Sequence, residues 1–216
     1  MTNMRAFVSA SCLCVLHLLA AGSAGAQAKP VVFTLGADLI SNSIDPVAAK
    51  NAGVGRRATG AQLTGGMTAF RVLSVNLEGG IVGMSDEAPF TQETNQGEKT
   101  SGVAAGMGSL SVGLRTPALS LGGERPVTLA AGVNAGHTLL DVTRTITNCT
   151  DCHGESVGVE AGSFWEPVVQ VGRGRGAVNA RYRTYTGGSN FQDALILGFA
   201  ITVERKARPE ASTPAP

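Results

Sequence analysis

The sequence predicts an all-β protein, an antiparallel up-and-down transmembrane β-barrel of eight strands. Three observations lead to this fold class: an export signal at the N-terminus, segments in which large apolar residues alternate with small or polar ones, and connections that are alternately short and long. Alternation at a period of two places the two sets of side chains on opposite faces of a strand. In a membrane-spanning barrel the apolar face meets lipid and the other face meets the lumen.

Residues 1–28 have the composition of a cleaved secretory signal. Arg5 supplies the positive charge, residues 6–21 are largely apolar, and residues 24–28 (Ala-Gly-Ala-Gln-Ala) offer small-x-small cleavage sites. The apolar run is shorter than the roughly 20 residues that span a bilayer as a helix, so we expect removal rather than anchoring. Because the segment holds one basic and no acidic residue, the 17 Lys and Arg fall to 16, against 16 Asp and Glu. A neutral mature chain without a basic patch argues against a nucleic-acid partner.

The mature chain divides into a barrel domain, residues 29–205, and a Pro/Ala-rich tail, residues 206–216, which we expect to be disordered. The clearest strand is 194–203, where Leu197 and Phe199 share one parity and Gly198 and Ala200 the other. Polar stretches at 41–57 and 85–101 are expected to be long loops, and 127–147 with 157–171 a hairpin projecting beyond the membrane. The eight predicted strands are residues 31–40, 58–70, 73–84, 102–115, 127–147, 157–171, 177–186 and 194–203.

With this pattern the chain resembles small, single-domain outer-membrane β-barrel proteins of Gram-negative bacteria, including those similar to the transmembrane domain of outer-membrane protein A. The resemblance covers the whole mature chain. It implies a place in the cell outer membrane, contact with outer-membrane lipid and insertion by the barrel assembly machinery. A soluble sandwich or lipocalin-like barrel is the alternative, because alternation alone does not say which face is wet.

The parity expected to face the lumen carries charges of both signs. An ionised group inside a narrow barrel must be paired or hydrated, so these residues form either a network that locks the strands together or a path for ions. An eight-stranded barrel is only wide enough for its own side chains, which favours the network and argues against an ordinary porin. The predicted lumenal charges are Asp38, Glu78 and Glu166 with Arg115, Arg181 and Arg183.

Cys149 and Cys152 are the two cysteines outside the signal, and with His153 they form a C-x-x-C-H motif. The motif fits a disulfide at a loop tip, covalent attachment of c-type haem, or a metal site. We expect the disulfide, because the flanking segments are strand-like and no methionine follows residue 107 to act as a second haem ligand. Two thiols and one imidazole also leave a tetrahedral metal site one ligand short. No cofactor or metal is therefore expected.

An enzyme is the rival interpretation, since a few outer-membrane barrels that modify lipid A use His, Ser and an acidic residue near the outer leaflet. Here Glu155, Ser156 and His153 lie together in a predicted loop, and His137 lies on a strand. Nearness in sequence does not supply a nucleophile with an oriented base, so no catalytic residue is assigned. We expect a structural or surface-binding role carried by extracellular loops whose ligand is unknown. The alternatives are an enzyme acting on lipid A or phospholipid and an exported c-type haem protein.

Overall fold

The computed structural model describes residues 31–87, 100–124, 126–147 and 154–203; the predicted signal, the cysteine motif and the C-terminal tail lie outside these ranges. Short strands β5 (Leu119–Leu121) and β7 (Glu155–Ser156) and helix α2 (Pro46–Ala52) occupy connections. Within the described part of the chain, no helix is long and apolar enough to cross a membrane. The eight long strands are β1 (Val31–Ile44), β2 (Val54–Ala69), β3 (Leu73–Asp86), β4 (Thr100–Arg115), β6 (Val127–Thr147), β8 (Ser163–Arg173), β9 (Gly176–Thr186) and β10 (Phe191–Val203).

The eight long strands close into one barrel. Each pairs antiparallel with the long strands next to it in the chain, and β10 pairs back with β1. Following hydrogen-bonded partners from Ile40 reaches Val142 of β6 in one direction and Gly132 of β6 in the other, an offset of ten residues. With eight strands, that stagger corresponds to a tilt of about 40° from the barrel axis. The predicted fold class is confirmed.

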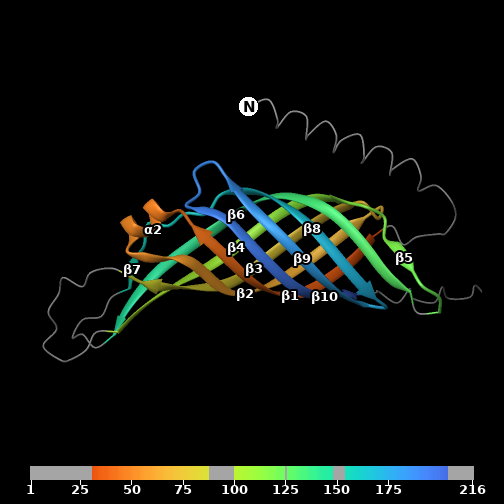
Figure 1. Cartoon of the computed structure of the whole chain (residues 1–216), viewed down its shortest axis with the longest axis horizontal. Helices are drawn as coiled ribbons and strands as arrows, with labels where there is room; N and C mark the ends of the chain where they lie inside the picture. The colour runs from red at the N-terminus through yellow and green to blue at the C-terminus, as the bar shows by residue number, and fades with distance from the viewer. Residues whose placement is uncertain (1–30, 88–99, 125, 148–153, 204–216) are drawn as a thin grey trace, which may run out of the picture.

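The two ends of the cylinder differ (Figure 1). We call them the α2 end, which also carries β7, and the β5 end. The ends of β1, β3, β6 and β9 that lead into the next connection lie at the α2 end, and those of β2, β4 and β8 lie at the β5 end. The outer ends of β1 and β10, at Val31 and Val203, also lie at the β5 end because the strand number is even. Small outer-membrane barrels have this arrangement, with their longer loops facing outward.

A continuous apolar belt covers the outside of the barrel. On β1 it runs from Val31 to Leu39, eight residue steps, which at 3.3 Å per residue and a tilt of about 40° spans roughly 20 Å along the axis. Trp165 and Tyr182, both 46% exposed, lie toward the α2 end of the belt. Such a belt is far larger than the apolar patches of soluble monomers, which argues against the lipocalin-like alternative. Exposed members on other strands include Leu63, Leu77, Ile81, Leu110, Val112, Val178, Leu195, Leu197 and Phe199.

The long loop predicted at 41–57 is wrong. β1 continues to Ile44, and a short helix fills the gap before β2. The Asp45 carboxylate accepts hydrogen bonds from the backbone N–H groups of Val47 and Ala48, both at 3.0 Å, and Gly53 ends the helix with φ 65°. These are ordinary helix-capping signals, with proline at the first helical position, in a stretch whose polarity indicated a loop.

The hairpin predicted between 127–147 and 157–171 forms only in part. β8 begins at Ser163 and pairs with residues 127–137 of β6, β7 pairs with residues 143–144, and β4 pairs with residues 132–147 on the other side of β6. Residues 157–162 form no strand: the Val157 N–H donates to the carbonyl of Val142 at 3.0 Å and the Thr138 N–H to the carbonyl of Gly162 at 3.0 Å, but between these ends the chain turns, with the Val159 N–H donating to the carbonyl of Val157 at 2.7 Å. Val157 and Val159 are buried in the mouth of the barrel, so their alternation reflects packing there rather than a strand.

Candidate functional site: a charge cluster in the lumen

The lumen has three layers along the barrel axis. Toward the α2 end it is apolar, at mid-height it holds buried charges, and toward the β5 end it is lined by small and polar residues. The apolar layer also receives Ala49 of α2 and Val157 and Val159 of the segment before β8, so these connections cap the barrel. The other buried side chains of this layer include Ile40, Ile44, Val54, Val82, Met84, Val103, Met107, Val142, Phe164, Tyr185, Phe191 and Ile196.

Arg183 of β9 lies at the boundary between the apolar and charged layers and is fully buried. Its Nη2 donates to Glu78 Oε2 at 2.6 Å, and its Nε donates to Glu166 Oε2 at 2.9 Å. The guanidinium carbon lies 3.8 Å from the ring centre of Phe164, in cation–π contact. Arg183 therefore joins two carboxylates from β3 and β8 while stacking on the base of the apolar layer.

Arg181, two residues earlier on the same face of β9, binds all three lumenal carboxylates. Its Nη2 donates to Asp38 Oδ2 at 2.6 Å, and its Nη1 contacts Glu166 Oε1 at 3.4 Å and forms a close ion pair with Glu78. In the sequence, Arg181 lies 103 positions after Glu78 and 143 positions after Asp38. These contacts cross the barrel interior, so they hold β1, β3, β8 and β9 together directly.

Arg115 of β4, the sixth predicted lumenal charge, is not part of this ion-paired cluster. Its Nη1 donates to Gln170 Oε1 at 2.9 Å, and within the described residues it makes no ion pair. The five remaining residues, which we call the charge cluster, carry three carboxylates and two guanidinium groups, a formal charge of −1. The +1 charge of Arg115 lies in the adjacent layer of the same lumen and balances it.

Neutral side chains complete the cluster, and the sequence analysis did not single them out. Asn134 donates to Glu166 at 3.0 Å, Gln62 donates to Asp38 at 3.3 Å, and Ser109 accepts from Arg183 at 3.2 Å. All three are buried polar residues of the inward parity, which is the signal that could have identified them. Gly198 of β10 makes room for Asp38, since a Cβ there would lie 1.7 Å from Asp38 Oδ1.

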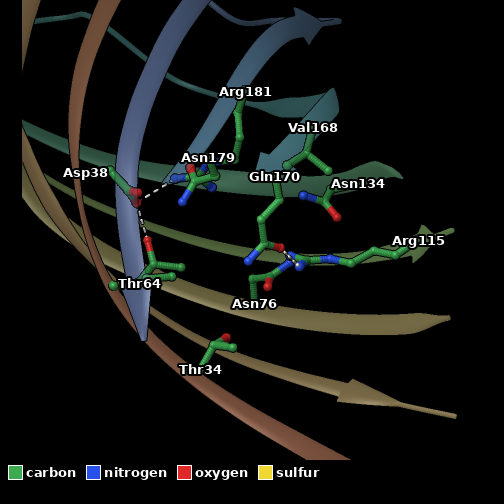
Figure 2. Close-up of a pocket in the computed structure, with 12 residues that line it drawn as sticks. Thr34, Asp38, Thr64, Asn76, Arg115, Asn134, Val168, Gln170, Asn179 and Arg181 are labelled. Atoms are coloured by element: carbon green, nitrogen blue, oxygen red, sulfur yellow. Dashed lines mark hydrogen bonds and ion pairs between the residues drawn. The ribbon is translucent and has the colours of Figure 1, made fainter. Parts of the chain in front are cut away.

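A cavity of about 40 Å³ adjoins the cluster on the side of the β5 end. Figure 2 shows the polar side chains that converge on it from β1, β2, β3, β4, β6, β8 and β9. Four buried polar atoms of its lining residues have no hydrogen-bond partner among the described residues: Asp38 Oδ1, Asn179 Oδ1, Arg115 Nε and Arg181 Nε. A cavity of this size and polarity can hold a few water molecules, the usual partners of such atoms.

The charge cluster lacks the parts of a catalytic or metal site. Its arginines are bound to carboxylates, and the described residues contain no group of three or more His, Cys, Asp and Glu that could hold a metal ion. On the outer surface His137 Nδ1 lies 3.2 Å from the Ser163 hydroxyl. Within the described residues nothing orients the other ring nitrogen, so this pair is not a triad. Side-chain contacts of His153 and Glu155 lie outside what the structure describes, as do Cys149 and Cys152.

The loop that contains α2 is firmly attached to the barrel. Arg144 of β6 donates to the carbonyls of Ala52 at 2.8 Å and Gly53 at 3.3 Å while its Nε binds Asp86 at 3.1 Å. Beside the helix is an open cleft of about 240 Å³, with Lys50 among the residues that line it. The α2 connection therefore presents an ordered surface.

No protein-family model matches the chain, and no curated protein matches it. Among solved structures it is similar to Ail, the attachment invasion locus protein of Yersinia pestis, with 11% identity and a TM-score of 0.40 over 80% of this chain and 97% of that chain. The structure of Ail in complex with the heparin analogue sucrose octasulfate is 12% identical, with a TM-score of 0.43 over 80% of this chain and 97% of that chain. Neisserial surface protein A is 8% identical, with a TM-score of 0.38 over 80% of this chain and 97% of that chain. Identities and scores this low do not transfer a function.

Proposed function

We propose that this protein is an outer-membrane β-barrel with a filled lumen, whose role is structural or surface-binding and is carried by the connections at the α2 end. One observation carries the proposal: a closed cylinder has an apolar belt outside and tightly packed side chains inside. The belt has the apolar, outward-facing character of the lipid-contacting band of a transmembrane barrel, so outer-membrane lipid is its proposed partner. The barrel assembly machinery is the proposed route of insertion.

A filled lumen supports a scaffold rather than a pore. An ion crossing the barrel would have to pass the apolar layer, where Ile44 and Ile196 are 2% and 0% exposed, and then displace carboxylate–guanidinium pairs. Moving an ion through such a layer is strongly unfavourable. Of the two roles that the sequence allowed, a network that locks the strands together and a path for ions, we therefore propose the network for the charge cluster.

Orientation and location can be tested with single cysteines in a Cys149→Ser/Cys152→Ser background. Lys50→Cys on α2 and Ser120→Cys on β5 are matched positions, because both side chains are exposed and they lie at opposite ends. A membrane-impermeant maleimide is expected to label Lys50→Cys on intact cells and Ser120→Cys only after the outer membrane is permeabilised. The reverse pattern, or equal labelling of both in intact cells, contradicts the proposal.

Lipid hydrolysis is the second candidate, because the His137–Ser163 contact lies on the outer surface and brings a base next to a hydroxyl. Without a third group to orient the imidazole, we expect no turnover of phospholipid or lipid A by the purified barrel. Turnover that is abolished by both Ser163→Ala and His137→Ala would replace the scaffold proposal with an enzyme.

A further inference from the structure

The hairpin turn between β2 and β3 has an unusual backbone. The Val72 N–H donates to the carbonyl of Ala69 at 3.1 Å, and the two residues between them, Phe70 and Arg71, have φ of 51° and 65°. Positive φ at both central positions is the signature of a type I′ turn, for which Asn-Gly is the preferred pair. Bulky residues there are strained, and every other positive-φ position in the described residues is a glycine.

The side chains of this turn gain little from the barrel itself. Phe70 is 76% exposed, more than Leu63 or Leu139 at 71%, and Arg71 is also exposed. Neither side chain makes a hydrogen bond or ion pair with the described residues. Strain of this kind persists where surrounding interactions offset it, and the described part of the barrel supplies no side-chain hydrogen bond or ion pair that does so.

The position of the turn indicates what surrounds its side chains. It lies at the β5 end, where Val31 pairs with Ala69 and the apolar belt reaches its border at Leu73. The turn between β8 and β9 lies on the opposite side of the barrel, with two strands between the turns in either direction, and the exposed Arg173 is the last residue of β8 before it. Cations and an aromatic ring thus occupy the border between the belt and the surrounding solvent.

We propose that Phe70 and Arg71, with Arg173 across the barrel, anchor the β5 end to phospholipid headgroups of the leaflet that surrounds it. The Phe70 ring inserts at the boundary between headgroups and acyl chains, continuous with the belt, where aromatic side chains are favoured. The guanidinium of Arg71 binds headgroup phosphate, whose charge and geometry suit its forked donors. This anchor rests on the proposed function, because it requires the belt to lie in a bilayer.

The test compares unfolding in two kinds of bilayer, one of phosphatidylcholine and phosphatidylglycerol, the other of digalactosyldiacylglycerol, which has no phosphate. Arg71→Gln keeps the strain and removes the charge, so the folded-to-unfolded ratio is expected to fall about fivefold in the phosphate bilayer. In the galactolipid bilayer the same variant should match wild type. An equal effect of Arg71→Gln in both bilayers overturns phosphate binding.

Two further variants separate strain from insertion. Arg71→Gly relieves the strained φ, so the folded-to-unfolded ratio should rise roughly tenfold in the galactolipid bilayer. In the phosphate bilayer it should rise much less, because the variant also loses the guanidinium. Phe70→Asn places a residue that adopts positive φ readily but removes the aromatic ring, so the folded-to-unfolded ratio should fall in both bilayers. If Phe70→Asn instead raises the folded-to-unfolded ratio in both bilayers, the ring is not inserted and the anchor is overturned.

Failure of the anchor and failure of the proposed function give different results. If wild-type protein does not insert, and unheated samples show no compact species on a gel, the membrane assignment itself is wrong and the anchor with it. If wild-type protein inserts but the Arg71 variants respond identically in the two bilayers, only the anchor is wrong.

Discussion

Replacing Arg183 with methionine is expected to be among the most destabilising single substitutions in this barrel. The change removes both hydrogen bonds to Glu166 and Glu78 and the contact with Phe164, while methionine fills much of the volume. It also takes the charge cluster from −1 to −2, leaving Arg181 to serve three carboxylates. Removing one partner from a buried ion pair costs about 3–5 kcal/mol, which is the expected loss in free energy of unfolding.

Glu166→Gln provides the matched comparison. It keeps the shape and a hydrogen-bond acceptor, and it takes the cluster from −1 to 0, so the expected loss is smaller, about 1–2 kcal/mol. The double variant restores the wild-type charge of −1 and should cost less than the two single losses added together, by about 1–3 kcal/mol.

The assay is urea unfolding in phospholipid vesicles, followed by gel mobility of unheated samples and by fluorescence of Trp165, the single tryptophan of the chain. Trp165 is 46% exposed on the belt, so its emission reports departure from lipid. Strictly additive losses, or a Glu166→Gln loss as large as that of Arg183→Met, would refute the account of the cluster.

Three further substitutions test other layers of the barrel. Phe199→Arg on the outer face should cost about 2–4 kcal/mol near the bilayer midplane in the same unfolding assay, and full tolerance would contradict the lipid-facing assignment. Gly198→Ala puts a Cβ 1.7 Å from a cluster carboxylate and should destabilise the barrel by about 1–3 kcal/mol. Gly106→Ala, with nothing within 4 Å, is its control, and equal losses would count against the packing described. Replacing Cys149 and Cys152 together with Ser should leave folding and insertion intact; a Soret band from wild-type protein made with haem-attachment machinery would instead establish a haem site.

The faces of the strands were predictable because a period-two pattern maps directly onto the two sides of a sheet. Leu197 and Phe199 face out, and Gly198 and Ala200 line the interior, as their parity indicated. The lumenal position of charged residues followed from the same parity. The pairing of these charges could not be predicted from parity, because it depends on the stagger of the barrel. Arg181 binds carboxylates of β1, β3 and β8, whereas Arg115 binds the amide of Gln170.

The apolar layer of the lumen was not foreseen. Near the α2 end both parities of a strand are apolar, as with Leu39 and Ile40 of β1 or Leu195 and Ile196 of β10, so alternation fades where the interior becomes dry. A local loss of alternation within otherwise alternating strands is the sequence signal of such a layer. Residues 157–162 were misassigned for the opposite reason, since alternation persists there although no strand forms before β8.

The most direct test of the central claim is separation of outer membrane, inner membrane and periplasm, followed by gel electrophoresis of heated and unheated samples. The account predicts that the protein is found with the outer membrane and that unheated protein migrates as a compact species that heating converts to the full-length mobility. Recovery in the periplasm or the inner membrane, or identical mobility with and without heating, would contradict a closed barrel embedded in the outer membrane.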